Sequence, residues 1–211
     1  MGNNLSRIIV QNLLEIKAIK FNFNDPFVWT SGWKSPVYCD NRMSLSNHQI
    51  RTLIKDAYVQ VVQEKFPCAE LIAGVATGAI AQGALVADKL NLPFVYVRER
   101  AKEHGLKKII EGHLEPGQKA VVIEDHISTG GSSLKALQEL RNAGANVLGM
   151  VAVFSYGFPI AKDKFEENNC RLFTLSDFST IVDVAYNDGY VTEKERDELN
   201  KWHENPQEFG F

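Results

Sequence analysis

Two acidic residues and a turn rich in hydroxyl groups and glycine stand together in the middle of the 211-residue sequence. Glu124 and Asp125 follow the apolar run 120–123 (AVVI), and residues 128–133 (STGGSS) come soon after. Glycines let backbone N–H groups approach a ligand, and Ser and Thr hydroxyls add donors, so the turn suits a phosphate monoester. Carboxylates would repel a phosphate but accept hydrogen bonds from two adjacent hydroxyls. A phosphate beside a vicinal diol describes a ribose 5-phosphate.

A purely structural explanation of these residues also stays open. The turn 128–133 could be an ordinary helix N-cap, and the acidic pair could be a solvated strand end. The order of strand, acidic pair, turn and helix favours ligand binding. The Walker A pattern is absent, and no G-x-G-x-x-G follows a strand. Both absences argue against a nucleoside triphosphatase and a dinucleotide-binding fold of the usual kind.

A second polar stretch, residues 98–115, concentrates positive charge, and its basic residues are Arg98, Arg100, Lys102, His104, Lys107 and Lys108. The stretch lies between two expected core strands but has little apolar periodicity, and it contains Gly112 and His113. We therefore predict a mobile active-site flap, because long connections without a core of their own are often lids. The alternative is a solvated, charged connection.

The elements that must position these residues alternate between strand and helix. From residue 71 to 175 we predict strands at 71–75, 92–97, 120–123, 147–154 and 171–174, and helices at 80–90, 134–140 and 160–168. This alternation predicts a parallel α/β sheet. Outside it we expect helices at 4–18, 46–65, 176–184 and 192–202, with Ser46 as the N-cap of the second. Extended segments are expected at 27–30 and 36–40.

Composition and charge narrow the class of protein. The formal net charge of −3 gives no reason to expect nucleic-acid binding. The three cysteines, Cys39, Cys68 and Cys170, form no C-x-x-C, which fits a reducing cytoplasm and offers neither a disulfide framework nor a zinc site. No apolar run approaches membrane-spanning length. We expect a cytoplasmic protein without nucleic-acid or membrane partners.

Three motifs resemble one family. Residues 121–133 (VVIEDHISTGGSS) resemble the phosphoribosyl pyrophosphate (PRPP) motif of type I phosphoribosyltransferases. Residues 29–42 (WTSGWKSPVYCDNR) resemble the N-terminal signature of orotate phosphoribosyltransferases, and R-x-x-A-K-x-H-G at 98–105 resembles their flexible catalytic loop. From residue pattern alone, the aromatic-rich segment 21–44 fits a flat, polar-edged pocket for a planar anionic ring and a packed β-hairpin equally well.

The resemblance implies an α/β, type I phosphoribosyltransferase fold, in which helices flank a central, mostly parallel sheet and a small N-terminal hood is added. It implies a hood region at 1–45 that contributes to the base site, a PRPP-binding core at 46–175 with a flexible loop at 98–115, and C-terminal helices at 176–211. The implied reaction transfers the phosphoribosyl group from PRPP to orotate, with Mg²⁺, in de novo pyrimidine (UMP) biosynthesis. The products are orotidine 5′-monophosphate and pyrophosphate. A homodimer that shares the loop 98–115 across its interface is expected.

The resemblance also implies residue roles. Lys102 and Asp125 are expected to be catalytic, and Lys34, Tyr38 and Ser128 to bind orotate. The expected PRPP contacts are Arg98, Lys102, His104, Glu124, Asp125, His126, Ile127, Ser128, Thr129, Gly130, Gly131 and Ser132. Magnesium is expected to be held through the substrate, with no direct protein ligand. Two alternatives remain, a phosphoribosyltransferase for a purine base and a non-catalytic regulator that senses PRPP.

Overall fold

The computed structural model describes residues 3–29, 32–100 and 109–209. The chain divides into two compact units. The core unit is Arg51–Leu175, and the terminal unit combines Met1–Ile50 with Ser176–Phe211. Across the described ranges, no helix has both the length and the apolar character needed to cross a membrane.

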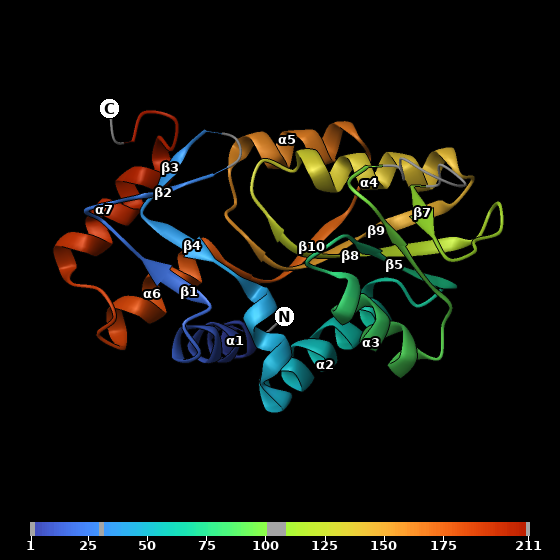
Figure 1. Ribbon diagram of the computed structural model, residues 1–211, viewed down its shortest axis with the longest axis horizontal. Coiled ribbons are helices and arrows are strands. Elements are labelled where there is room, and N and C mark those ends of the chain that lie inside the picture. Colours follow the sequence, from blue (N-terminus) through green and yellow to red (C-terminus); the bar gives the residue numbers. More distant parts are fainter. Residues whose placement is uncertain (1–2, 30–31, 101–108, 210–211) are drawn as a thin grey trace. The chain divides into compact units, whose positions relative to one another are not determined.

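A six-stranded sheet forms the centre of the core unit (Figure 1). Its strands lie in the order β10 (Leu172–Asp177), β9 (Asn146–Ser155), β8 (Lys119–Ile127), β5 (Leu71–Val75), β6 (Phe94–Val97) and β7 (Ile110–Glu111). β5 pairs in parallel with β6 and β8, and β8 pairs in parallel with β9. β7 is antiparallel to β6. The predicted mostly parallel sheet is confirmed.

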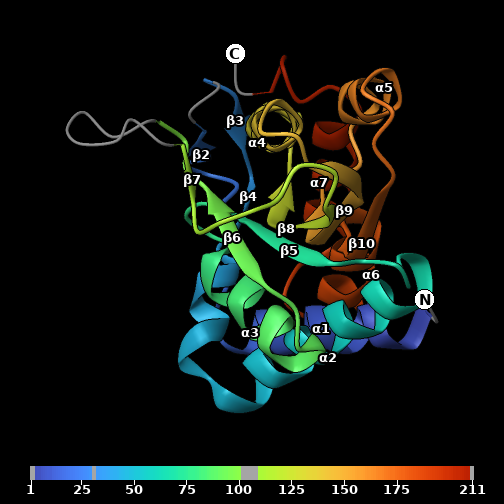
Figure 2. The same ribbon diagram turned by 90° about the vertical axis from the view of Figure 1, so that its right-hand side faces the viewer.

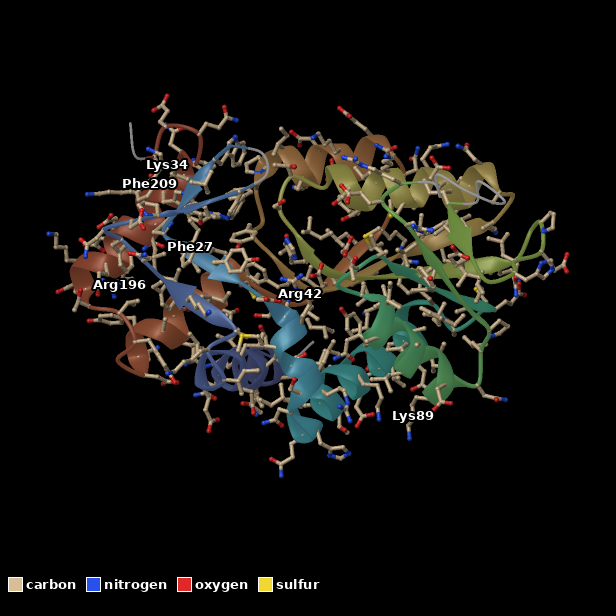
Figure 3. All side chains as sticks on the ribbon, viewed as in Figure 1. Phe27, Lys34, Arg42, Lys89, Arg196 and Phe209 are labelled. Carbon is tan, nitrogen blue, oxygen red and sulfur yellow. The ribbon has the colours of Figure 1, made fainter. Side chains whose placement is uncertain are left out.

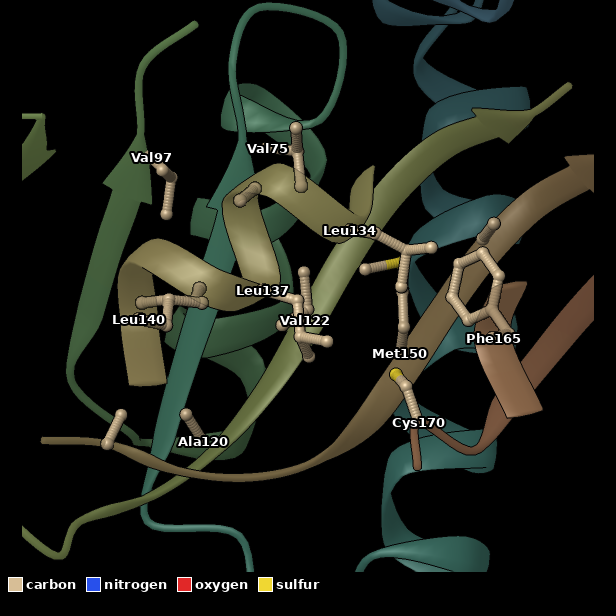
Figure 4. Packing of buried hydrophobic residues seen from close by; sticks show 14 of the residues in the cluster. Val75, Val97, Ala120, Val122, Leu134, Leu137, Leu140, Met150, Phe165 and Cys170 are labelled. Carbon is tan, nitrogen blue, oxygen red and sulfur yellow. The ribbon is translucent and has the colours of Figure 1, made fainter. Parts of the chain in front are cut away.

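Helices cover both faces of this sheet. α2 (His48–Lys65) and α3 (Ile80–Leu90) lie on one face, and α4 (Gly131–Asn142) and α5 (Pro159–Glu167) lie on the other (Figures 1 and 2). Leu134, Leu137 and Leu140 recur at helical spacing on α4, and all three are buried against the sheet (Figure 4). This apolar stripe fixes α4 to the sheet, so the turn that opens the helix has a rigid support.

Two glycines bring α3 close to the sheet. A Cβ at Gly83 would lie 2.8 Å from the ring of Phe94, and a Cβ at Gly74 would lie 2.9 Å from the carbonyl oxygen of Ala79. Larger residues would push the helix away from β5. The close packing keeps the turn between β5 and α3, residues 76–79, tight against the end of the sheet.

The terminal unit contains two small antiparallel pairs and three helices. β1 (Ile19–Phe21) pairs with β4 (Val37–Cys39), and β2 (Phe27–Val28) pairs with β3 (Lys34–Ser35). The helices are α1 (Asn3–Glu15), α6 (Phe178–Asn187) and α7 (Glu193–Glu204). The buried Trp202 of α7 donates a hydrogen bond of 2.9 Å to the carbonyl oxygen of Lys34. Figure 3 labels Lys34 and Phe27 on the β2–β3 pair, which α7 thereby anchors.

Most predicted elements are confirmed, and the predicted bounds of β5 and α3 agree with the structure. The prediction of Ser46 as N-cap is wrong. Ser46 ends the 3-10 helix η1 (Asn41–Ser46), and the side-chain oxygen of Asn47 accepts hydrogen bonds from the backbone N–H groups of Gln49 and Ile50. These are the donors that a helix leaves unpaired at its start, so Asn47 caps α2.

Replacing Asn47 by alanine removes this cap. We expect Asn47→Ala to lower the free energy of unfolding by about 1 kcal/mol. Urea denaturation followed by circular dichroism measures the change. Ser46→Ala, one residue earlier, is the matched control and should leave stability almost unchanged. Equal effects of the two substitutions would contradict the assignment.

Candidate active site

The acidic pair lies inside β8, whereas the sequence pattern had predicted that it follows the end of the strand. Glu124 is opposite Ala152 of β9, and the pairing continues to Ile127 opposite Ser155. The prediction was wrong because acidic residues are depleted in strands, while hydrogen bonding to β9 carries the strand through them. Successive side chains of a strand point to opposite faces, so the two carboxyl groups face different surroundings.

Glu124 is enclosed, with only 4% of its surface exposed. Its Oε2 accepts a hydrogen bond of 2.7 Å from the hydroxyl of Ser133 on α4. Its Oε1 accepts one of 2.9 Å from the backbone N–H of Asp125. The hydroxyl of Tyr58 on α2 donates to its backbone carbonyl oxygen. Every oxygen of Glu124 therefore has a partner within the core unit.

Asp125 is more open, and 18% of its side chain is exposed. Its Oδ1 accepts a hydrogen bond of 2.8 Å from the backbone N–H of His126, and the Nδ1 of His126 lies 3.1 Å from the same oxygen. Its Oδ2 packs against Gly78 in the turn 76–79, where a Cβ would lie only 2.1 Å away. The glycine gives Asp125 the space for this orientation.

The two neighbouring carboxyl groups have opposite pKa shifts. Burial, together with the charge of Asp125 and a hydrogen bond to it, raises the pKa of Glu124 well above its ordinary value. Burial would also raise the pKa of Asp125, but hydrogen bonds from His126 and Glu124 and the charge of His126 lower it to about 2. The surroundings therefore favour the neutral form of Glu124 and the anionic form of Asp125.

The turn after β8 opens α4. Gly130 has φ +76°, a conformation that favours glycine, and α4 begins at Gly131. No side chain in the described part of the protein caps this helix start. Ser128 and Thr129 are partly exposed, and Gly131 and Ser132 are exposed. The first N–H groups of α4 and these hydroxyls form a site suited to an anion.

α5 supports this turn from a distant part of the sequence. The ammonium group of Lys164 lies 3.4 Å from the carbonyl oxygen of Thr129. The ring of Phe165 packs on Gly130, where a Cβ would lie 3.0 Å from it. The sequence did not indicate Lys164 or Tyr58, because neither belongs to a recognisable motif, whereas the small-residue turn 76–79 that contains Gly78 was predicted to suit an anion.

Arg98 lies at the end of β6 and borders a cavity of about 190 Å³. The cavity also touches Ser132 and Gly131, so the structure brings together predicted residues from two motifs. The guanidinium of Arg98 lies 3.3 Å from the carboxylate of Glu111 on β7. Within the predicted flap 98–115, residues 110–111 form the short strand β7 at the edge of the sheet. Lys102 and His104 lie outside the described residues.

Two of the three predicted orotate contacts, Lys34 and Tyr38, belong to the terminal unit, and the third, Ser128, belongs to the core unit. Lys34 is on β3, and Tyr38 is on β4, 36% exposed, with its ring centroid 5.4 Å from that of Phe27. Among residues 3–29, 32–100 and 109–209, no cluster of three or more His, Cys, Asp and Glu residues could hold a metal ion.

Known proteins resemble this chain over nearly its whole length. The model of the phosphoribosyl transferase domain matches residues 43–188. The orotate phosphoribosyltransferase of Porphyromonas gingivalis is 53% identical over 207 residues, which covers 98% of this chain and 99% of that protein. The chain belongs to the orotate phosphoribosyltransferases.

Solved structures agree with this membership and with the predicted fold. The orotate phosphoribosyltransferase of Aeropyrum pernix superposes with a TM-score of 0.75 at 27% identity, covering 87% of this chain and 99% of that one. Leishmania donovani UMP synthase gives a TM-score of 0.81 at 22% identity, covering 94% of this chain and 42% of that one. The second likeness concerns the fold alone. The type I phosphoribosyltransferase fold predicted from the motifs is confirmed.

Gly78→Ala tests the packing of Asp125. The added methyl group would lie 2.1 Å from Oδ2 and 3.0 Å from the Cβ of Asp125, so the carboxylate must turn away. We expect PRPP binding, measured by titration calorimetry, to weaken about tenfold or more. In an Asp125→Asn background the same substitution should add little, because the two residues act together. Fully additive losses would contradict this contact.

The raised pKa of Glu124 predicts a pH-dependent stability. Above about pH 4.5, the unfolded chain loses the Glu124 proton that the folded protein keeps. Stability must then fall as pH rises towards the folded pKa, by at most about 1.4 kcal/mol per pH unit from this group. Glu124→Gln removes this titrating carboxyl group. Urea denaturation should therefore show the wild type losing stability relative to the variant as pH rises. A difference that does not change with pH would refute this assignment.

Proposed function

We propose that the protein transfers the 5-phosphoribosyl group of PRPP to orotate, giving orotidine 5′-monophosphate and pyrophosphate in de novo UMP biosynthesis. One observation carries the proposal. The ionised Asp125 lies in β8, two residues before the strand ends, and the uncapped start of α4 follows it, in a chain that is 53% identical to an orotate phosphoribosyltransferase. A carboxylate that can bind a diol, next to a helix start that can bind a phosphate, suits the ribose 5-phosphate part of PRPP.

The sugar would be held at both ends. The phosphate would accept hydrogen bonds from the backbone N–H groups of residues Ile127, Ser128, Thr129, Gly130, Gly131 and Ser132. The side-chain hydroxyls of Ser128, Thr129 and Ser132 would also donate to it. Asp125 would accept hydrogen bonds from the ribose hydroxyls. As the bond to pyrophosphate breaks, positive charge develops on the ribose ring, and a fixed carboxylate with a low pKa stabilises it without reorganisation. His126 supports this role because it keeps Asp125 ionised.

The departing pyrophosphate needs positive charge. Arg98, on the cavity beside the start of α4, supports this part of the proposal. By family resemblance, Lys102 and His104 join it in neutralising the pyrophosphate, and Lys102 acts as proton donor. Closure of the loop 98–115 would exclude the water that could otherwise hydrolyse PRPP.

Magnesium fits this arrangement. The ion prefers oxygen ligands, keeps several waters, and commonly uses one or two carboxylates together with substrate phosphates. Asp125 would bind the ribose hydroxyls of PRPP, and the phosphates of PRPP would supply oxygen ligands to the ion. When bound, the ion would neutralise charge on the pyrophosphate. The ion would be held through the oxygens of PRPP and through water, with no direct protein ligand.

We also propose that Lys34, Tyr38 and Ser128 contact orotate, and that the enzyme is a cytoplasmic homodimer sharing the loop 98–115. The spacing of the three cysteines supports a reducing environment, because they form no C-x-x-C and no disulfide framework is expected from them. The 53% identity to a protein named orotate phosphoribosyltransferase supports the choice of base.

The test is consumption of orotate followed optically, with PRPP and Mg²⁺ present. We expect orotate loss together with pyrophosphate release, and no comparable release with adenine or hypoxanthine. Release with a purine alone would reassign the base. Binding of PRPP without any release would indicate a regulator and overturn the proposal.

Asp125→Asn probes the carboxylate in the same assay. A charged hydrogen bond to the sugar contributes about 1.5–3 kcal/mol, so kcat/KM for PRPP should fall about tenfold to a hundredfold. The exposed Asp163 on α5 provides the matched control, and Asp163→Asn should retain full activity. Normal kinetics of Asp125→Asn would refute its role.

A further inference from the structure

Two neighbouring residues of α5 contact the turn that opens α4. Lys164 donates a hydrogen bond of 3.4 Å to the carbonyl oxygen of Thr129, and the ring of Phe165 packs on Gly130. We infer that Lys164 is a positioning residue, which orients the peptide group between Thr129 and Gly130 so that its N–H group faces the 5′-phosphate of PRPP. This inference rests on the proposed function and adds to it a residue from outside the three motifs.

The geometry of the peptide group explains how Lys164 acts at a distance. A trans peptide group is planar, and its C=O and N–H bonds point in opposite directions. The carbonyl oxygen of Thr129 accepts the hydrogen bond from Lys164 and so faces α5. The N–H of Gly130 belongs to the same peptide group and therefore points away from α5. Gly130 is the N-cap of α4, where N–H groups are free to bind an anion.

The turn needs this support because its backbone is permissive. Gly130 has φ +76°, and glycine adopts positive and negative φ with similar ease. Gly131 follows directly, so the peptide group before Gly130 can rotate unless a contact holds it. The ring of Phe165 limits movement on one side, where a Cβ of Gly130 would lie 3.0 Å from it. The hydrogen bond from Lys164 then fixes the direction of the carbonyl group.

The helix that carries Lys164 is itself fixed to α4. Arg141, in the last turn of α4, donates hydrogen bonds of 2.8 Å and 3.3 Å to the carbonyl oxygens of Asn168 and Asn169, just after α5. Phe165 of α5 and Leu134 of α4 are buried in the same apolar cluster (Figure 4). Lys164 therefore acts from a rigid support. A donor that is held in its binding direction loses less conformational freedom when the ligand arrives.

The charge of Lys164 alone is the competing explanation, because an ammonium group attracts a phosphate from any direction. Lys162 carries the same charge on the same helix, two residues earlier. Its side chain is 76% exposed, and its ammonium group lies 3.9 Å from the carboxylate of Glu166. If charge alone mattered, removing either lysine would weaken phosphate binding to a similar extent. Orientation of the turn instead requires the contact that Lys164 makes with Thr129.

Lys164→Met tests the hydrogen bond, because methionine keeps a long side chain but cannot donate. We expect the KM for PRPP to rise about fivefold, the value of one ordinary hydrogen bond, with kcat within about twofold of wild type. The 5′-phosphate lies away from the bond that breaks, so its contacts contribute equally to binding of substrate and transition state. Lys164→Arg restores a charged donor and should recover most of the loss. Lys162→Met is the matched control and should leave both constants unchanged.

Two ligands separate the turn from the rest of the site. Ribose 5-phosphate carries the 5′-phosphate, whereas pyrophosphate represents only the leaving group. Titration calorimetry should show that Lys164→Met binds ribose 5-phosphate more weakly by the same factor as the rise in KM, while inhibition by pyrophosphate stays unchanged. Thermal unfolding of each variant measures any general loss of stability. The inference is overturned if Lys164→Met behaves like Lys162→Met, if Lys164→Arg recovers nothing, or if pyrophosphate inhibition weakens equally.

These outcomes distinguish the inference from the proposed function. If wild-type protein consumes no orotate with PRPP and Mg²⁺, the proposed reaction fails, and the ribose 5-phosphate titrations still decide the role of Lys164. Wild-type protein that neither reacts nor binds ribose 5-phosphate overturns both. If the wild type is active and the Lys164 variants give any of the overturning results, only the role of Lys164 fails.

Discussion

The buried carboxyl group of Glu124 is the constraint on which the site depends. A polar group without access to water must find partners inside the protein, and here they come from the following residue and from α4. A third partner, Tyr58 of α2, bonds the backbone of the same residue. Because these partners lie on elements above and below the sheet, satisfying one buried residue fixes the relative positions of a strand and two helices.

Glu124 and Asp125 occupy adjacent positions on a strand, so their carboxyl groups have different surroundings. Side chains alternate between the two faces, so one carboxyl group enters the interior while the other faces the turn after β5. Burial raises the pKa of the first, and hydrogen bonds and the charge of His126 lower the pKa of the second. In the proposed reaction, the carboxylate of Asp125 would meet the charge that develops on the sugar.

Local patterns predicted most of the framework. The bounds of β5 and α3 follow from an apolar run, a small-residue turn and helical spacing, which all act over a few residues. The extent of β8, the cap at Asn47 and the short strand β7 were missed or misassigned. Each depends on hydrogen bonds whose partners local spacing does not specify, and pairing with β9 or β6 overrides local preference.

The sequence by itself determined the chemistry and the family. Acidic, hydroxyl and glycine residues in one short motif indicated a sugar phosphate, and three motifs in order indicated orotate phosphoribosyltransferases, which the comparisons confirm. Only the tertiary structure decided which carboxyl group is enclosed and which is open. The contacts around the motif come from residues such as Tyr58, Gly78 and Lys164, which lie dozens of residues away in the sequence and meet it only when the sheet and its helices assemble.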